Sequence, residues 1–192
     1  MSEPTLVLAS GSPRRLALLS QIGVTPARVI PADIDETPRP KELPRDYAER
    51  MAYQKAQTIL SAHSGAFVLG ADTVVACGRR ILPKAECEQS ARECLELLSG
   101  RAHRVWSGVA LLGPQTNSVR VVETRVKVRR LSTKAIEAYL ASDEWRGKAG
   151  GYAIQGLFAA HIISIVGSYS NVVGLPLYET ANLLGGAGLF AP

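Results

Sequence analysis

The sequence predicts an α/β or α+β protein built on a mixed β-sheet. Stretches typical of strands alternate irregularly with helical stretches along the 192 residues. In "TRVKVRR" (residues 124–130), apolar and basic side chains alternate, so this strand should have one exposed face. A half-exposed strand does not suit a sheet that is parallel throughout, because such sheets are covered on both faces. We expect lobes on either side of a cleft.

Composition leaves several functional classes open and excludes others. Hydrophobic residues make up 46% of the chain, enough for one substantial core or two small lobes. The most apolar segment, "YAIQGLFAAHIISIVGSY", is interrupted by Gln155 and His161, which does not suit a membrane span. The sequence also does not open with a basic stretch followed by an apolar one, as a signal peptide would. We therefore expect a cytoplasmic protein without a membrane span. Three cysteines and three scattered histidines indicate neither a disulfide framework nor a zinc site. A net charge of +5 suits a small anion or a nucleic acid equally.

The first motif, "LASGSPRRLALL", predicts a buried strand at residues 6–8 followed by a helix. Ser12 is a suitable N-cap, and Pro13 suits a first helical position. Arg14 and Arg15 then lie in the first turn, where the helix dipole disfavours each cation by a few tenths to about 1 kcal/mol. An anionic ligand would remove this conflict.

A second helix should begin at Asp46, after the proline-rich loop "ETPRPKELPRD". One face of it is formed by Ala48, Ala52, Lys55, Ile59 and Ala62. Lys55 is the exception in this apolar stripe. Either its stem packs while the ammonium reaches water, or the ammonium points into a cleft toward an anion.

The run "AFVLGADTVVA" (residues 66–76) predicts a strand covered on both faces, with Asp72 in its middle. A buried carboxylate costs several kcal/mol unless it is paired, hydrogen-bonded or bound to a metal. Asp72 is therefore either one member of a structural pair or a reactive group, and the sequence alone favours neither.

The second half of the chain continues the pattern. Residues 86–100 predict a helix that ends near Gly100, and residues 103–113 predict a strand. The basic face of residues 124–130 could touch nucleic acid, although a solvated strand surface is the commoner case.

Ser132 should cap a short helix that runs through Tyr139. "WRGKAGGYAIQG" then supplies glycines whose backbone N–H groups could approach phosphate, although neither a P-loop nor a dinucleotide fingerprint is present. Residues 167–184 predict a turn, a short strand, a break and a final helix, and "GGAGLFAP" (185–192) predicts a frayed tail.

Five segments resemble, in this order, the Maf family of nucleoside triphosphate pyrophosphatases: "LASGSPRRLALL", "GADTVV", "LSGRAHRVWSGVAL", "GKAGGYAIQG" and "GSYSNVVGLP". The resemblance implies the fold shared with inosine triphosphate pyrophosphatases (the Maf/Ham1 fold), as one domain over residues 1–192 with two lobes around a central cleft. It also implies hydrolysis of a nucleotide to its monophosphate and pyrophosphate, and a homodimer is possible.

The same resemblance assigns roles to individual residues. Asp72 matches the proton acceptor that activates water. The substrate-binding set it implies is Ser10, Arg14, Arg15, Lys55, Thr73, Lys84, Lys148 and Gln155. A divalent cation, Mg²⁺ or Mn²⁺, is expected, with Asp35, Glu36 and Asp72 as ligands.

Base selection divides the family that the chain resembles. Arg14, Thr73 and Gln155 match the branch acting on dTTP and UTP, whereas the 7-methyl-GTP branch has an aromatic residue after Ser-Pro and altered Asp-Thr and Ile-Gln-Gly elements. A glutamine amide can pair with the pyrimidine edge in both directions. The sequence departs from the family's pattern at two places: the family's Lys-Pro is Lys84-Ala85 here, and Val128 replaces an aromatic residue.

Three hypotheses follow, each for a different class of protein. The first is a metal-dependent pyrophosphatase acting on dTTP and UTP, with 7-methyl-GTP as the alternative substrate. The second is a nucleotide-binding regulator of cell division, linked to septum formation. The third is a nucleic-acid-binding module around Lys127, which is disfavoured because no aromatic stacking residues are interleaved with the charges.

Overall fold

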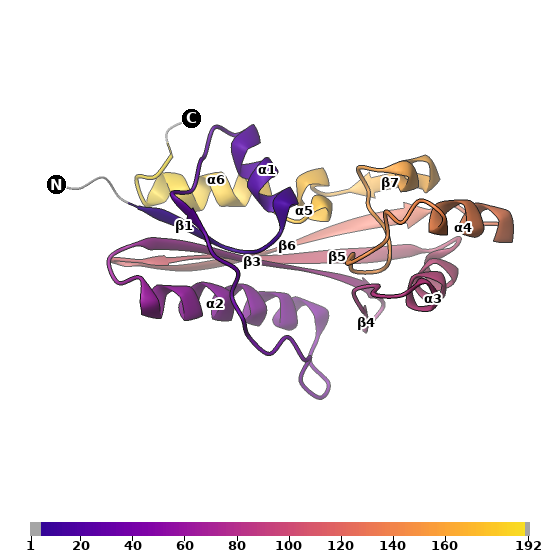
Figure 1. The fold of residues 1–192 in the computed structure, drawn as a ribbon, viewed down its shortest axis with the longest axis horizontal. Coiled ribbons are helices and arrows are strands. Elements are labelled where there is room, and N and C mark those ends of the chain that lie inside the picture. Colours follow the sequence, from indigo (N-terminus) through magenta and orange to yellow (C-terminus); the bar gives the residue numbers. More distant parts are fainter. Residues whose placement is uncertain (1–4, 191–192) are drawn as a thin grey trace.

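The computed structural model describes residues 5–190, in which a seven-stranded mixed sheet is flanked by helices (Figure 1). The strands are β1 (Leu6–Ala9), β2 (Arg28–Val29), β3 (Phe67–Cys77), β4 (Arg80–Leu82), β5 (Ala102–Gly113), β6 (Thr116–Val128) and β7 (Ile162–Val166). The helices are α1 (Pro13–Gln21), α2 (Pro44–Ala62), α3 (Glu88–Leu98), α4 (Thr133–Leu140), the 3₁₀ helix η1 (Leu157–His161), α5 (Tyr169–Val173) and α6 (Leu177–Gly186). Within this described part, no helix has the length and apolar character needed to cross a bilayer.

The sheet has the strand order β2-β1-β3-β5-β6-β7, and β4 also pairs with β3. β1 runs parallel to β2 and β3, whereas the remaining pairs are antiparallel. The mixed sheet predicted from the sequence is confirmed. So is the half-exposed strand, because Arg125 and Lys127 of β6 are exposed while Val126 and Val128 are buried.

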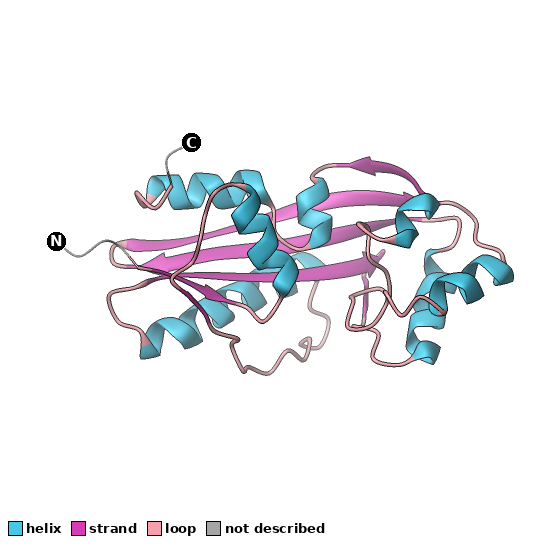
Figure 2. Cartoon of the chain, turned by 45° about the horizontal axis from the view of Figure 1, so that its top comes forward, coloured by secondary structure: helices cyan, strands magenta, loops and turns pink. Residues whose placement is uncertain are grey.

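Helices cover the sheet in two groups. At one end α2 packs below the sheet while α1 and α6 pack above it, and α3 and α4 lie at the other end (Figure 1; Figure 2). Alternate residues of β3 serve the two layers: Leu69 and Ala71 pack in the cluster that contains α1 and α6, and Val68 packs with α2. The long strands β3, β5 and β6 extend through both ends.

Several sequence-based boundaries differ from the structure. The short strand expected within residues 167–184 is wrong, because Tyr169–Val173 form helix α5, capped by the Ser168 hydroxyl that accepts from the Asn171 amide. Strand β7 was not predicted. Its run of β-branched residues lies inside an apolar segment that was assessed only as a candidate membrane span.

The chain's final segment is more ordered at its start than the sequence suggests. Helix α6 continues through Gly186, so it includes the first two residues of the expected tail. Leu189 and Phe190 pack against the core cluster of α1 and α6. Residues 191–192 of that expected tail lie outside the described residues.

One edge of β3 is open for part of its length. Pairing with β1 ends at the partners Ala9 and Gly70, and pairing with β4 begins at Val75 and Leu82. Between these points, no described strand pairs with β3 on this side. Asp72 and its neighbour Thr73 lie in this gap, and both line a cavity beside it.

Helix α2 lies unusually close to the sheet because glycines face it. A Cβ atom at Gly70 would collide with the Ala52 carbonyl oxygen, and one at Gly108 would collide with that of Ala48. The small side chains of α2 and these glycines let the helix backbone approach the strands directly. This approach positions the next turn of α2, which carries Lys55, over Asp72.

We expect Gly108→Ala to destabilise the protein, because the added methyl group has to push the α2 backbone away from β5. Overpacking of this kind costs about 1–3 kcal/mol, occasionally more. Urea denaturation would measure the loss. The matched control is Gly186→Ala, where a Cβ atom would meet nothing within 4 Å, and where the change should stay within about 0.5 kcal/mol. Equal stability of the two variants would contradict the close-packing argument.

Candidate active site

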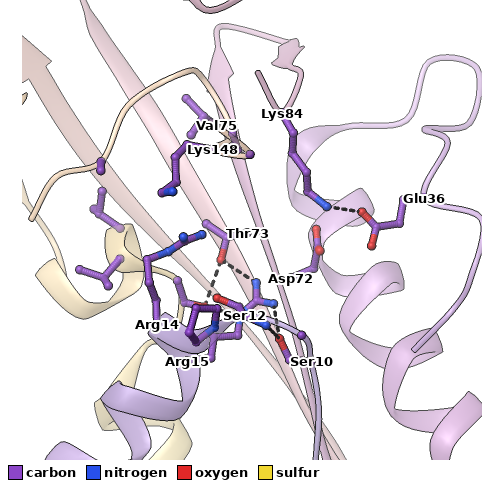
Figure 3. A pocket seen from close by; sticks show the side chains of 18 of the residues that line it. Ser10, Ser12, Arg14, Arg15, Glu36, Asp72, Thr73, Val75, Lys84 and Lys148 are labelled. Carbon is purple, nitrogen blue, oxygen red and sulfur yellow. Dashed lines mark hydrogen bonds and ion pairs between the residues drawn. The ribbon is translucent and has the colours of Figure 1, made fainter. Parts of the chain in front are cut away.

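A cavity of about 480 Å³ lies at the open edge of β3 (Figure 3). Its walls come from the end of β1, the start of α1, and the glycine-rich segment of residues 147–155. Its volume falls within the range of small-molecule sites. The ionisable lining comprises five cationic side chains and three carboxylates, namely Arg14, Arg15, Lys55, Lys84 and Lys148, and Glu36, Asp72 and Glu86.

Arg14 points into the cavity without a protein partner. Helix α1 begins at Pro13, so Arg14 lies in its first turn as predicted, although the Ser12 side chain at the N-cap accepts no hydrogen bond. Among the described residues, Arg14 has neither a hydrogen bond nor an ion pair, and partial burial lowers the pKa of its guanidinium. The conflict between this cation and the helix dipole is therefore not relieved within the chain.

Arg15 differs from Arg14 because neutral acceptors hold it in place. Its Nε donates to the Gly174 carbonyl at 2.8 Å, Nη1 donates to Ser10 Oγ at 3.0 Å, and Nη2 donates to Thr73 Oγ1 at 3.3 Å. Three of its five N–H groups are thus used, and two remain for a ligand. Burial lowers the pKa of Arg15, and the negative charge of Asp72 opposes this effect.

Lys55 and Asp72 form a buried ion pair, with Nζ 2.6 Å from Oδ1 and side chains only 8% and 7% exposed. The interpretation that the Lys55 ammonium reaches water is wrong, because the close approach of α2 directs it toward the cavity. One of the two interpretations of Asp72 from the sequence was a structural pair, and the structure shows that Asp72 is paired with Lys55. Its other oxygen, Oδ2, accepts no hydrogen bond from the described residues, so the carboxylate retains a free atom for chemistry.

Glu36 connects two lysines across the cavity. Its Oε1 lies 2.6 Å from Lys55 Nζ and its Oε2 lies 2.6 Å from Lys84 Nζ. Partial burial alone would raise the pKa of Glu36, but the hydrogen bonds from the two lysines outweigh it and lower the pKa to about 2. The Tyr47 hydroxyl donates to the Glu36 carbonyl at 2.6 Å and so ties this loop to α2.

Lys148 lies opposite Arg14 on the glycine-rich segment (Figure 3). Its Nζ donates to the Arg146 carbonyl at 3.1 Å. No described carboxylate forms an ion pair with Lys148. Partial burial lowers the pKa of Lys148, and the neighbouring charge of Arg14 lowers it further. Arg14 and Lys148 are therefore two neighbouring cations that form no ion pair with the described residues, although the charge of Glu144 raises the pKa of Lys148 in part.

Three glycines of this segment have backbone conformations that other residues rarely adopt. Gly147, Gly150 and Gly151 have φ angles of 64°, 69° and 68°. A Cβ atom at Gly150 would lie 2.8 Å from a methyl group of Val75, and one at Gly151 would lie 3.2 Å from Ala91 Cα. The segment can thus lie against β3 and α3 and still present Lys148 to the cavity.

Gln155 is exposed at the rim of the cavity and has no hydrogen-bond partner within the described chain. The turn that carries it is held by Glu144, whose carboxylate accepts from the Leu157 amide at 2.8 Å. A Cβ atom at Gly156 would collide with that carboxylate, so a larger residue here would displace Glu144 from the turn. Gln155 is thus free to contact a ligand from a fixed turn.

Asp35 is the one predicted metal ligand that the structure does not bring to the cavity. It is exposed, and its Oδ1 accepts from the Thr37 amide at 2.9 Å. Hydrogen bonds from Thr37 lower the pKa of Asp35. Only Glu36 and Asp72 of the three predicted ligands line the cavity, and residues 5–190 contain no cluster of three or more metal-ligating side chains.

Sequence reasoning missed several residues that support the site. Gly174 supplies the carbonyl that holds Arg15, and Ser107 Oγ lies 2.8 Å from Thr73 Oγ1. Tyr152 lines the cavity and its hydroxyl lies 2.8 Å from His103 Nε2; burial lowers the pKa of His103 to about 4. Little in the sequence indicates these residues. A contact made by a backbone carbonyl leaves no pattern of side chains, and a single serine in an apolar strand is common.

The arrangement combines two chemical features in one cavity. Within residues 5–190, the Asp72 carboxylate at the base keeps one unpaired oxygen, and Arg14 and Lys148 on another wall form no ion pair. The first can accept a proton from water, and the second can bind an anion with several oxygens. Such a site suits hydrolysis of a polyanionic small molecule.

We expect nuclear magnetic resonance titration of the Glu36 carboxyl carbon to give a pKa near 2, below its ordinary value of 4.5. Because the folded-state pKa is the lower one, the interactions of Glu36 stabilise the protein above about pH 4.5 and are lost as the pH falls toward 2. Lys84→Met should raise the pKa of Glu36, since one of the two donors is removed. A value near 4.5 in the unaltered protein would contradict the bridged geometry.

Several known proteins are similar to this chain along nearly its whole length. A family described as "Maf-like protein" matches residues 5–187. A relative from Paramagnetospirillum magneticum, called "dTTP/UTP pyrophosphatase", is 61% identical over 188 residues, which cover 97% of this chain and 98% of the relative. Relatives with the same name from Caulobacter vibrioides and Rhodopseudomonas palustris (strain HaA2) are 59% and 56% identical, over 96% and 98% of this chain and 96% and 94% of their own lengths.

Among solved structures, a HAM1 protein from Coxiella burnetii has a TM-score of 0.54, with 15% identity, over 95% of this chain and 99% of that one. This likeness concerns the fold and confirms the architecture that the sequence resemblance implied. The family match spans nearly the whole chain and the relatives are similar along their full lengths. The chain therefore belongs to the Maf family.

Proposed function

We propose that this protein hydrolyses dTTP and UTP to the nucleoside monophosphate and pyrophosphate. The observation that carries the proposal is the presence, in one cavity, of a buried aspartate and two cations, Arg14 and Lys148, that form no ion pair within the described residues. Relatives called "dTTP/UTP pyrophosphatase" at up to 61% identity support the choice of nucleotide.

In the proposed reaction a water molecule attacks the α-phosphorus. Asp72 accepts the water proton at Oδ2 while Lys55 holds Oδ1 at 2.6 Å and so fixes the direction of the carboxylate. The new bond joins the water oxygen to the α-phosphorus. The bond from the α-phosphorus to the α,β-bridging oxygen breaks, and pyrophosphate leaves with that electron pair.

Several cations of the cavity would bind the triphosphate. Arg14 and Lys148 lie close to each other in the cavity wall and form no ion pair with the described residues, so they would bind phosphate oxygens directly. Arg15 has two N–H groups left after its three hydrogen bonds and would add a fixed guanidinium to the same site. Lys84 contributes a point charge from the other side, next to Glu36.

The residues present also fit a divalent cation. Lys55 Nζ contacts Glu36 Oε1 and Asp72 Oδ1 at 2.6 Å each, which indicates that the two carboxylates converge on a single cationic group. Mg²⁺ is commonly bound by one or two carboxylates together with substrate phosphates. Glu36 and Asp72 would therefore hold Mg²⁺ or Mn²⁺ in company with the nucleotide, and the ion would neutralise charge on the departing pyrophosphate.

Gln155, Thr73 and Arg14 are our proposed determinants of base selection. Gln155 is unpartnered and offers both a donor and an acceptor to the carbonyl and N3–H edge of uracil or thymine. Thr73 lies in the open edge of β3, where its hydroxyl is already shared among Arg15, Ser107 and Gly174. Its position is thus fixed before a ligand arrives.

We expect Asp72→Asn to reduce turnover of dTTP and UTP by a hundredfold or more, since the proton acceptor is lost. Pyrophosphate release would be measured with dTTP, UTP, CTP and 7-methyl-GTP, in Mg²⁺, in Mn²⁺ and with a chelator. The chelator should stop release. Asp46→Asn is the matched control, because Asp46 is exposed on α2 and should leave activity within about twofold. Absence of release from every nucleotide would contradict the proposed function.

We expect Gln155→Leu to lower kcat/KM for dTTP and UTP by about tenfold, because roughly one to two hydrogen bonds to the base are lost. Gln155→Glu retains an acceptor for N3–H but not the amide donor, so its loss should lie between those of the leucine variant and the unaltered protein. Unchanged kcat/KM for both pyrimidine nucleotides in the leucine variant would remove Gln155 from base recognition.

A further inference from the structure

The segment "GSYSNVVGLP" forms part of the family resemblance, but the reaction described above uses none of its side chains. In the structure its Asn171 lies on α5 and is 0% exposed. Asn171 Nδ2 donates to Thr124 Oγ1 at 2.9 Å and to the carbonyls of Val105 and Val122 at 3.2 and 3.4 Å. One amide thus connects α5 to both β5 and β6.

Further polar contacts hold the same short helix. Thr124 Oγ1 accepts from the Ser168 amide at 3.0 Å and donates to the Ser168 carbonyl at 3.2 Å. Ser107 Oγ donates to the Asn171 carbonyl at 3.2 Å and also lies 2.8 Å from Thr73 Oγ1. A helix of five residues has little stability of its own, so its position depends on these contacts.

The end of α5 reaches the cavity. Gly174 follows the helix with a φ angle of 139°, and its carbonyl accepts from Arg15 Nε at 2.8 Å and from Thr73 Oγ1 at 3.2 Å. The orientation of both side chains is therefore set by where α5 places this carbonyl. Asn171 is three residues away and anchors the helix to the sheet.

We propose that Asn171 is a positioning residue for substrate binding, which acts by fixing α5 and, through the Gly174 carbonyl, the Arg15 guanidinium and the Thr73 hydroxyl. The proposal rests on the proposed function, since Arg15 and Thr73 are there assigned to nucleotide binding. Asn171 itself does not touch the nucleotide.

The geometry predicts which kinetic constant responds. Asp72 and Lys55 face the α2 side of β3, where Gly70 and Gly108 hold the helix close to the sheet. Thr73 is the next residue along β3 and faces α5 on the opposite side. Loss of the Asn171 anchor should therefore weaken nucleotide binding and leave the catalytic pair in place.

The test compares Asn171→Ala with the unaltered protein, using dTTP, UTP and CTP as substrates. We expect KM for dTTP and UTP to rise about tenfold, kcat to fall less than threefold, and the preference for dTTP over CTP to narrow. The matched control is Thr180→Val, because Thr180 is also 0% exposed and its hydroxyl donates to the Pro176 carbonyl at 2.7 Å, outside the cavity. This control should lower the unfolding temperature without changing KM or preference.

A second variant covers the case in which Asn171→Ala fails to fold. Ser107→Ala removes only the hydroxyl that links Thr73 to the Asn171 carbonyl, and should raise KM in the same direction by a smaller factor. A binding measurement with the non-hydrolysable α,β-methylene analogue of dTTP gives a readout that does not require turnover. Its dissociation constant should rise about tenfold in Asn171→Ala.

The outcomes separate the two proposals. Absence of turnover in the unaltered protein would overturn the proposed function, whereas unchanged analogue binding in a folded Asn171→Ala protein would overturn the positioning role alone. A fall in kcat for all three nucleotides with constant KM would also overturn it, because a merely structural loss of active protein gives that pattern.

Discussion

The close contact between α2 and the sheet determines the chemistry of this site. Gly70 and Gly108 leave no Cβ atoms between the helix backbone and the strands, and the alanines of α2 keep its side chains short. The helix therefore lies near enough for Lys55 to place its ammonium 2.6 Å from Asp72. A lone buried carboxylate would cost several kcal/mol, and the ammonium offsets part of that cost while it holds the carboxylate in one direction. The packing of α2 against the sheet and the ion pair between Lys55 and Asp72 therefore depend on each other.

The charges in the cavity are organised in two parts. Around Glu36 and Asp72, each carboxylate has a lysine partner, and these contacts lower the pKa of Glu36 to about 2. Arg14 and Lys148 form no ion pair with a carboxylate of the described residues, and burial lowers the pKa of both groups, an effect that the charge of Glu144 only partly opposes at Lys148. Repulsion between uncompensated cations is unfavourable for the folded protein. A bound polyanion relieves this repulsion. The part of the cavity around Arg14 and Lys148 is therefore suited to a substrate, and the part around Glu36 and Asp72 is suited to holding a reactive group.

The site residues that the sequence predicted were those whose side chains conflict with their expected local environment. Arg14 stood out against the helix dipole, Lys55 against an apolar stripe and Asp72 against a buried strand, and all three line the cavity. The mixed sheet was also predictable, because alternation and apolar runs report burial directly. Helix α5 was not predictable, since three of its five residues favour strands and its position depends on contacts of Asn171 and Ser168 with Thr124, which is distant in sequence. Asp35 and Glu36 are adjacent and similar in type, so only the folded loop shows that one faces solvent and the other the lysines.

Strand β3 explains how one short sequence can serve two tasks. Consecutive side chains of a strand point to opposite faces, so Asp72 faces α2 and Thr73 faces α5. Both lie in the gap between β1, which ends at Ala9, and β4, which begins to pair only at Val75. In the proposed function, the proton acceptor is held from the α2 side, whereas Arg15 and Thr73 are held from the α5 side. We therefore expect substitutions that alter the packing of α5 to change nucleotide binding while the Lys55 and Asp72 pair, which is held from the other face, keeps its geometry.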